Sequence, residues 1–174
     1  MKESMVVGED RDRQEKIEAL LQAPCFVIDI LPQRVGRARA EQYFAVERHY
    51  SRGEEKQKLV QKWTDLLLKV SCYHDYEVCF HGVWRKNPAP HSLAQRVKAC
   101  VAGTEDDLKL LIDGGLAMIV VSKSDLHMSV YHPDERLTEL LSKLASAEGL
   151  FFWEAGAEPE CADSVGPMDE SKDR

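Results

Sequence analysis

The segment SCYHDYEVCFHG, residues 71–82, gathers four side chains of types that bind metal ions. Cys72 and His74 are followed by Cys79 and His81, and sulfur with imidazole nitrogen is the ligand set that a tetrahedral zinc ion prefers. Zinc-binding pairs usually lie on tight turns, whereas Cys79 and His81 fall on one face of a predicted strand, about 6.6 Å apart. We therefore expect no bound metal and interpret Cys79 as a small core residue. A zinc-stabilised domain remains an alternative.

Asp29 is the second candidate, because it places an ionisable group inside the apolar run CFVIDIL, residues 25–31. A carboxyl group that is buried without a partner has a raised pKa and a large desolvation cost, and functional carboxylates occur in such places. Strand alternation puts Asp29 on the face of Cys25, Val27 and Leu31. We expect it to emerge at the end of the strand or to accept hydrogen bonds from a helix N-terminus.

Nucleophilic catalysis needs a Cys or Ser with a base and an orienting group within hydrogen-bond reach. The chain has no G-x-S-x-G elbow and no cysteine-protease segment, and no spacing pairs Cys79 or Cys100 with one of the six histidines. Neither of the glycine-rich phosphate-binding motifs, G-x-G-x-x-G and G-x-x-x-x-G-K-[ST], occurs in the sequence. We assign no catalytic residue and no cofactor, and expect structural roles for His127, His132 and Asp134.

The same segment that holds Cys79 also carries large aromatic residues. Phe80, Trp84 and Tyr76 fall on one face of a strand predicted over residues 76–84. Exposed aromatic residues are common anchors of protein interfaces. Large apolar side chains are more often buried, so we expect a helix to cover these three.

Length and composition indicate a water-soluble globular protein. The chain has 174 residues, of which 44% are hydrophobic and 30% charged, enough to form a core without disulfides or metals. The first residues do not form a signal peptide, and no apolar run approaches the roughly 20 residues that span a bilayer. We expect a cytoplasmic location, no membrane contact and five free cysteines.

The formal charge of −7 is unevenly distributed. Residues 154–174 contain seven acidic and two basic residues, and their small, turn-forming composition predicts a flexible acidic tail. The rest of the chain is close to neutral and lacks the basic stripe that neutralises phosphates in duplex binding. The sequence therefore argues against a nucleic-acid partner.

The predicted helices and strands that would position these residues do not follow a strict βαβ order. Helices are expected over residues 11–22, 37–50, 54–70, 92–102, 104–113 and 133–148, and strands over residues 25–31, 76–84, 116–121, 126–131 and 150–153. This order predicts a single α+β domain over residues 1–153, with a mixed, roughly five-stranded sheet packed against helices.

The sequence favours a non-enzymatic protein-interaction or regulatory module. Its acidic tail would steer a basic protein partner toward the domain, and the oligomeric state is left open. The alternative is a small hydrolase or transferase whose site is assembled from distant residues. Asp29, Cys79 and His81 would then have to meet in one cleft.

Overall fold

The computed structural model describes residues 2–123 and 125–156, with the backbone alone over residues 2–10. Its helices are α1 (Lys2–Leu21), α2 (Ala40–Tyr50), α3 (Gly53–Val70), α4 (Pro90–Ala102) and α5 (Glu135–Ala147), and a 3-10 turn (Arg37–Arg39) precedes α2. Its strands are β1 (Cys25–Asp29), β2 (Tyr76–Phe80), β3 (Val83–Lys86), β4 (Leu108–Ile112), β5 (Ala117–Val121), β6 (Met128–Tyr131) and β7 (Phe151–Glu154). The predicted acidic tail lies almost wholly outside these residues.

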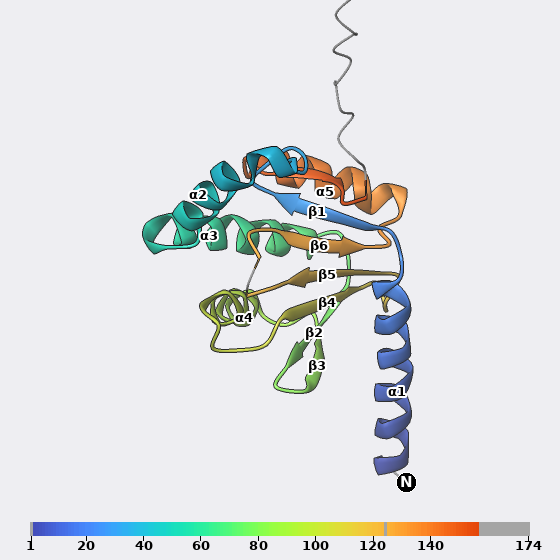
Figure 1. The fold of residues 1–174 in the computed structure, drawn as a ribbon. Helices are drawn as coiled ribbons and strands as arrows, with labels where there is room; N and C mark the ends of the chain where they lie inside the picture. Colours follow the sequence, from blue (N-terminus) through green and yellow to red (C-terminus); the bar gives the residue numbers. More distant parts are fainter. Residues whose placement is uncertain (1, 124, 157–174) are drawn as a thin grey trace, which may run out of the picture.

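The α+β class is confirmed, but the sheet is larger and simpler than the sequence predicts. Its strand order is β3-β2-β4-β5-β6-β1-β7 (Figure 1). Every neighbouring pair is antiparallel, so the sheet is not mixed and has seven strands instead of five. The predicted hairpin formed by β5 and β6, the helices α1, α2, α3 and α5, and the strands β1 and β7 are all present.

One of the additional strands arises because the aromatic run over residues 76–84 is a hairpin. His81 and Gly82 have φ values of +48° and +79°, as a two-residue type I′ turn requires. Cys79 therefore pairs with Trp84, and Phe80 with Val83. The pairing puts Trp84 on the face of Cys79, opposite the face of Phe80.

The other additional strand replaces the helix predicted over residues 104–113. Gly103 ends α4 in the left-handed conformation, with φ of +75°. Leu108–Ile112 then forms β4 between β2 and β5, and Gly114 and Gly115 make the turn into β5. The prediction was wrong because α1 covers Leu111 on the second face of β4, so the end of this strand does not alternate between apolar and polar residues.

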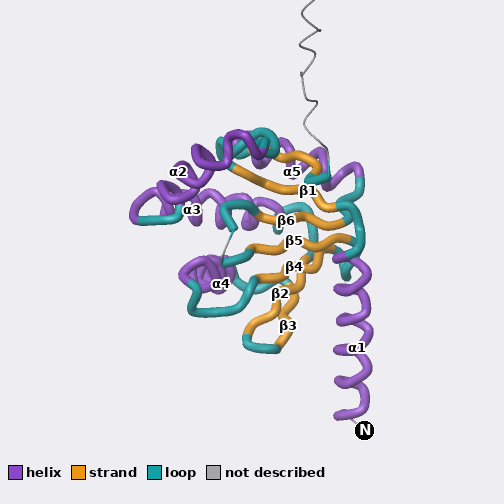
Figure 2. Tube along the Cα trace, in the orientation of Figure 1, coloured by secondary structure: helices purple, strands orange, loops and turns teal. Residues whose placement is uncertain are grey.

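Helices α3, α4 and α5 cover one face of the sheet, and α2 packs against α3 (Figure 2). The stripe predicted along α3 is confirmed, since Trp63 and Leu66 are fully buried. Asp134 caps α5 by accepting a hydrogen bond from the Leu137 N–H at 2.8 Å. None of the described helices combines the length and apolar character needed to cross a bilayer.

Of the described helices, α1 packs on the opposite face of the sheet. Ile17 and Leu20 of this helix pack on Leu111 and Met118, near one end of the strands. On the same face, the next row of paired residues crosses the sheet beside α1. Cys79 and Lys109 belong to this row when the β2–β4 pairing is continued by one residue. The row consists of Trp84, Cys79, Lys109, Val120, Ser129, Val27 and Trp153. We call the face of the sheet that carries this row the open face.

Candidate functional site

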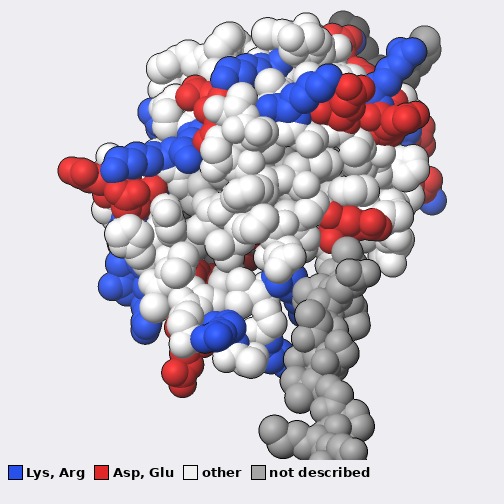
Figure 3. All heavy atoms as spheres, turned by 90° about the horizontal axis from the view of Figure 1, so that it is seen from above, with Lys and Arg blue, Asp and Glu red and all other residues white. Residues whose placement is uncertain are grey.

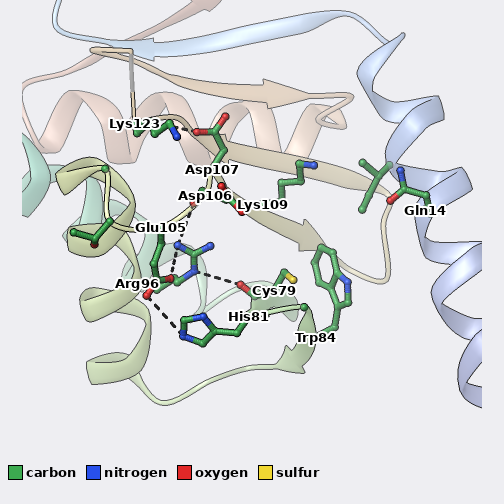
Figure 4. Close-up of a pocket in the computed structure, with 14 residues that line it drawn as sticks. Gln14, Cys79, His81, Trp84, Arg96, Glu105, Asp106, Asp107, Lys109 and Lys123 are labelled. Atoms are coloured by element: carbon green, nitrogen blue, oxygen red, sulfur yellow. Dashed lines mark hydrogen bonds and ion pairs between the residues drawn. The ribbon is translucent and has the colours of Figure 1, made fainter.

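A cavity of about 570 Å³ lies at the β2–β4 end of the open face. Trp84, Cys79 and Lys109 come from three adjacent strands, and Gln14 of α1 stands on the far side (Figure 4). The loop over residues 103–107 closes the other side. The cavity therefore depends on the antiparallel register, which aligns residues far apart in the chain.

Arg96 is the most buried charged side chain that lines this cavity. It follows Leu93 and precedes Val97 on the buried side of α4, and its side chain is 7% exposed. Its Nε donates to the carbonyl oxygen of Cys79 at 3.4 Å, and its Nη1 donates to the carbonyl oxygen of Asp106 at 3.1 Å. The guanidinium is thus held at a fixed position between α4, β2 and the loop before β4.

The same guanidinium forms an ion pair with Glu105. Nη1 lies 2.7 Å from Oε2 of Glu105, but the two groups are not oriented for a hydrogen bond, so this contact is an ion pair alone. Oε1 of Glu105 lies 3.8 Å from Nε2 of His81. Because Arg96 is charged at every accessible pH, its guanidinium charge stays in the cavity wall, directly beside the Glu105 carboxyl group.

The Nη2 of Arg96 has no hydrogen-bond partner within residues 2–123 and 125–156. Figure 4 shows it directed away from Glu105, toward the space between Lys109 and Trp84. An acceptor from a bound molecule would give this donor a hydrogen bond. This nitrogen faces the cavity, whereas the buried polar atom on the wall that lacks a hydrogen bond within the described residues is Oε2 of Glu105.

Two lysines bring further positive charge to the cavity wall. Lys109 and Lys123 line the cavity, and neither ammonium group has a partner in the described part of the chain. The exposed carboxylates of Asp106 and Asp107 lie on the loop side. Oδ1 of Asp107 accepts a hydrogen bond from the Lys123 backbone N–H at 3.2 Å. Cationic and acidic side chains therefore alternate around the cavity, and Figure 4 shows Lys123 beside Asp107.

The candidate residues predicted for an enzyme do not share a cleft. Cys79 and His81 line this cavity, but Asp29 ends β1, from which β2 is separated by β6, β5 and β4. Four strand spacings correspond to about 19 Å. The version of the hydrolase hypothesis that joins these three residues is therefore wrong.

The four predicted zinc ligands do not come together either. Cys72 and His74 precede β2, whereas Cys79 and His81 lie at its other end. Nδ1 of His74 is instead 2.6 Å from Oδ2 of Asp113. Among the residues that the structure describes, no three His, Cys, Asp or Glu side chains are arranged to hold a metal.

The predicted aromatic face is divided between the two sides of the sheet. Tyr76 is buried in the helix-covered core and Phe80 packs against it, as expected, but Trp84 lies on the open face. The guanidinium of Arg13 on α1 lies 5.3 Å from the Trp84 ring, and its Nη2 donates to Oε2 of Glu77 at 3.2 Å. These contacts fasten α1 beside the cavity.

Sequence reasoning missed Arg96, Lys109 and Lys123 as site residues. The one available signal is an arginine between apolar residues of a helix, since charged side chains are rarely buried without a partner. Lys109 gives no signal, because its strand was predicted as a helix. Comparison of the chain with protein-family models, with curated proteins and with solved structures found no match.

Proposed function

We propose that this protein is a binding module whose Arg96 cavity holds a carboxylate group of an acidic partner protein. The Nη2 of Arg96, which has no partner within the described residues and is directed into the cavity, is the observation that carries the proposal. The steering of a basic partner by the tail stays a separate prediction, because that segment lies outside the described residues.

A carboxylate fits the donor arrangement of the cavity. Its oxygens accept hydrogen bonds from guanidinium and ammonium groups, and such charge-assisted bonds are stronger than neutral ones. Arg96 is held by the carbonyl oxygens of Cys79 and Asp106, so little side-chain entropy is lost on binding. Lys109 and Lys123 would add attraction at longer range.

A protein segment fits the surroundings better than a free anion. The cavity continues into the open face, where Val120 and Ser129 are only half-buried, so an extended segment has a floor to lie on. The carboxylates of Asp106 and Asp107 can accept backbone N–H groups or a basic side chain next to the bound acid. We expect these acceptors to select an acidic residue with a donor beside it.

The surface charge argues for local recognition instead of a broad electrostatic patch. Figure 3 shows Lys, Arg, Asp and Glu side chains interspersed around a largely uncharged area on the face seen there. The part of the chain before the tail is nearly neutral. Specificity for an acidic segment would then depend on a few fixed contacts, as in interface hot spots.

A peptide titration followed by NMR tests the proposal. The probes are acetyl-Gly-Glu-Gly amide and the matching peptide with Gln, and the reporters are the Arg96 Nε–H and the Trp84 indole N–H. We expect saturable shifts with the Glu peptide and none with the Gln peptide. Lys109→Met and Lys123→Met should each weaken binding about two- to fivefold, since an exposed ion pair contributes up to about 1 kcal/mol.

Lys58→Met is the matched control, because it removes the same charge from an exposed position on α3 whose partner is Glu55. It should leave the affinity unchanged. Equal affinities for the two peptides, or chemical-shift changes that do not include the Arg96 Nε–H, would show that the cavity does not recognise a carboxylate.

A further inference from the structure

A second cavity, of about 390 Å³, lies at the opposite end of the open face. It is bounded by the end of β1, the loop that follows it, α2 and β7. No residue lines both this cavity and the one around Arg96. Its volume lies within the usual range for small-molecule sites, about 300–1,000 Å³.

Two aromatic rings from different elements form part of the wall. Trp153 of β7 is fixed because its Nε1 donates to the carbonyl oxygen of Leu31 at 2.9 Å. Tyr43 of α2 is half-buried on the cavity wall. With the apolar side chains of Val27 and Val35, they offer a wall suited to a flat, apolar surface.

Asp29 and His127 supply the polar groups within this wall. Continuing the β1–β6 pairing one residue beyond Ile28 and Met128 places them opposite each other on the open face. Oδ1 of Asp29 accepts the Leu31 N–H at 3.1 Å, and no side chain of the described residues donates a hydrogen bond to this carboxyl group. A carboxylate beside an imidazole presents an acceptor next to a group that can donate.

Arg34 and Arg37 line the cavity from the segment between β1 and α2. Both are exposed, and neither is paired with an acid in the described part of the chain. Guanidinium groups bind phosphate through two parallel hydrogen bonds. They are placed to hold an anionic group that remains outside the apolar part of the cavity.

We propose that this second cavity binds a mononucleotide. A nucleobase has a flat ring for the wall of Tyr43 and Trp153 and an edge of adjacent donors and acceptors for Asp29 and His127. Its 5′-phosphate would lie between Arg34 and Arg37. The proposal is independent of carboxylate binding at Arg96, because the two cavities share no lining residue.

Calorimetric titration of the full chain with the four ribonucleoside 5′-monophosphates tests this proposal. At least one should bind saturably, with NMR shifts at the Trp153 indole and at His127. Asp29→Asn should weaken that nucleotide at least about tenfold, as the loss of a charged hydrogen bond implies. The double variant Arg34→Gln, Arg37→Gln should weaken the nucleotide but not its nucleoside.

The controls separate this site from simple phosphate attraction and from the Arg96 cavity. Ribose 5-phosphate should bind much more weakly than the nucleotide, and saturating the Arg96 cavity with the Glu peptide should leave nucleotide binding unchanged. Lack of binding of all four nucleotides at millimolar concentration would overturn the proposal. So would equal binding of ribose 5-phosphate, or tighter binding of a single-stranded oligonucleotide than of any mononucleotide.

Discussion

The Nε of Arg96 donates a hydrogen bond to the carbonyl oxygen of Cys79 at 3.4 Å, which connects α4 to the last residues of β2. The same side chain reaches the loop before β4 through Asp106 and Glu105. One arginine thus holds together the three segments that build the cavity. Its removal should affect stability as well as binding.

Arg96→Met is expected to lower the free energy of unfolding by about 3 kcal/mol, because the substitution leaves Glu105 without its counter-charge in a half-buried position. Urea unfolding followed by circular dichroism measures the change. Adding Glu105→Gln should restore part of the loss. Lys98→Met, at an exposed position of the same helix, should stay within about 0.5 kcal/mol of the unchanged protein.

Asp29 should make the protein less stable as the pH rises. Burial raises the pKa of its carboxyl group above the ordinary value of 3.8, against the lowering effects of the Leu31 N–H and His127. The folded state then holds the proton more tightly than the unfolded state, so this group favours folding most at low pH. Its contribution is lost as the pH climbs from about 3.8 through the raised pKa.

Asp29→Asn removes this titration and keeps an oxygen that can accept the Leu31 N–H. The variant should therefore gain stability relative to the unchanged protein at pH 7 and show a smaller difference at pH 3. Urea unfolding at a series of pH values gives the difference curve. A difference that is constant with pH would mean that the carboxyl group has the same pKa in both states.

The attachment of α1 should depend on two apolar residues. Ile17 is 3% exposed and packs with Leu20 on the far face of the sheet, whereas Leu21 is 44% exposed. Ile17→Asp should release α1 and speed amide exchange along it, because a charge would be buried without a partner. Exchange in α3 should remain slow. The same change at Leu21 should have little effect, and equal effects at both sites would contradict this packing.

The cap of α5 should be measurable in isolation. Asp134 accepts the Leu137 N–H at 2.8 Å, so Asp134→Ala should cost about 1 kcal/mol of stability. Asp134→Asn keeps the acceptor and should cost much less. Thermal unfolding of the two variants provides the comparison, and equal losses would show that the charge of Asp134 matters more than the hydrogen bond.

The sequence by itself determined the elements whose patterns are local. The apolar stripe of α3, the cap of α5 and the strand around Val27 follow from spacing that a short window contains. The α+β class follows from the order of such elements. The presence of a half-buried carboxyl at Asp29 is also local, since polar residues in apolar strands are rare.

Only the tertiary structure decided which residues form the two cavities. The helix predicted in place of β4 was wrong because the coverage of Leu111 by α1 depends on residues about 90 positions earlier in the chain. The hairpin at His81 reverses the face on which Trp84 lies, and the register then brings Lys109 beside Cys79. Pairing between distant strands has no local signature, so the separation of Asp29 from Cys79 could not be predicted from the sequence.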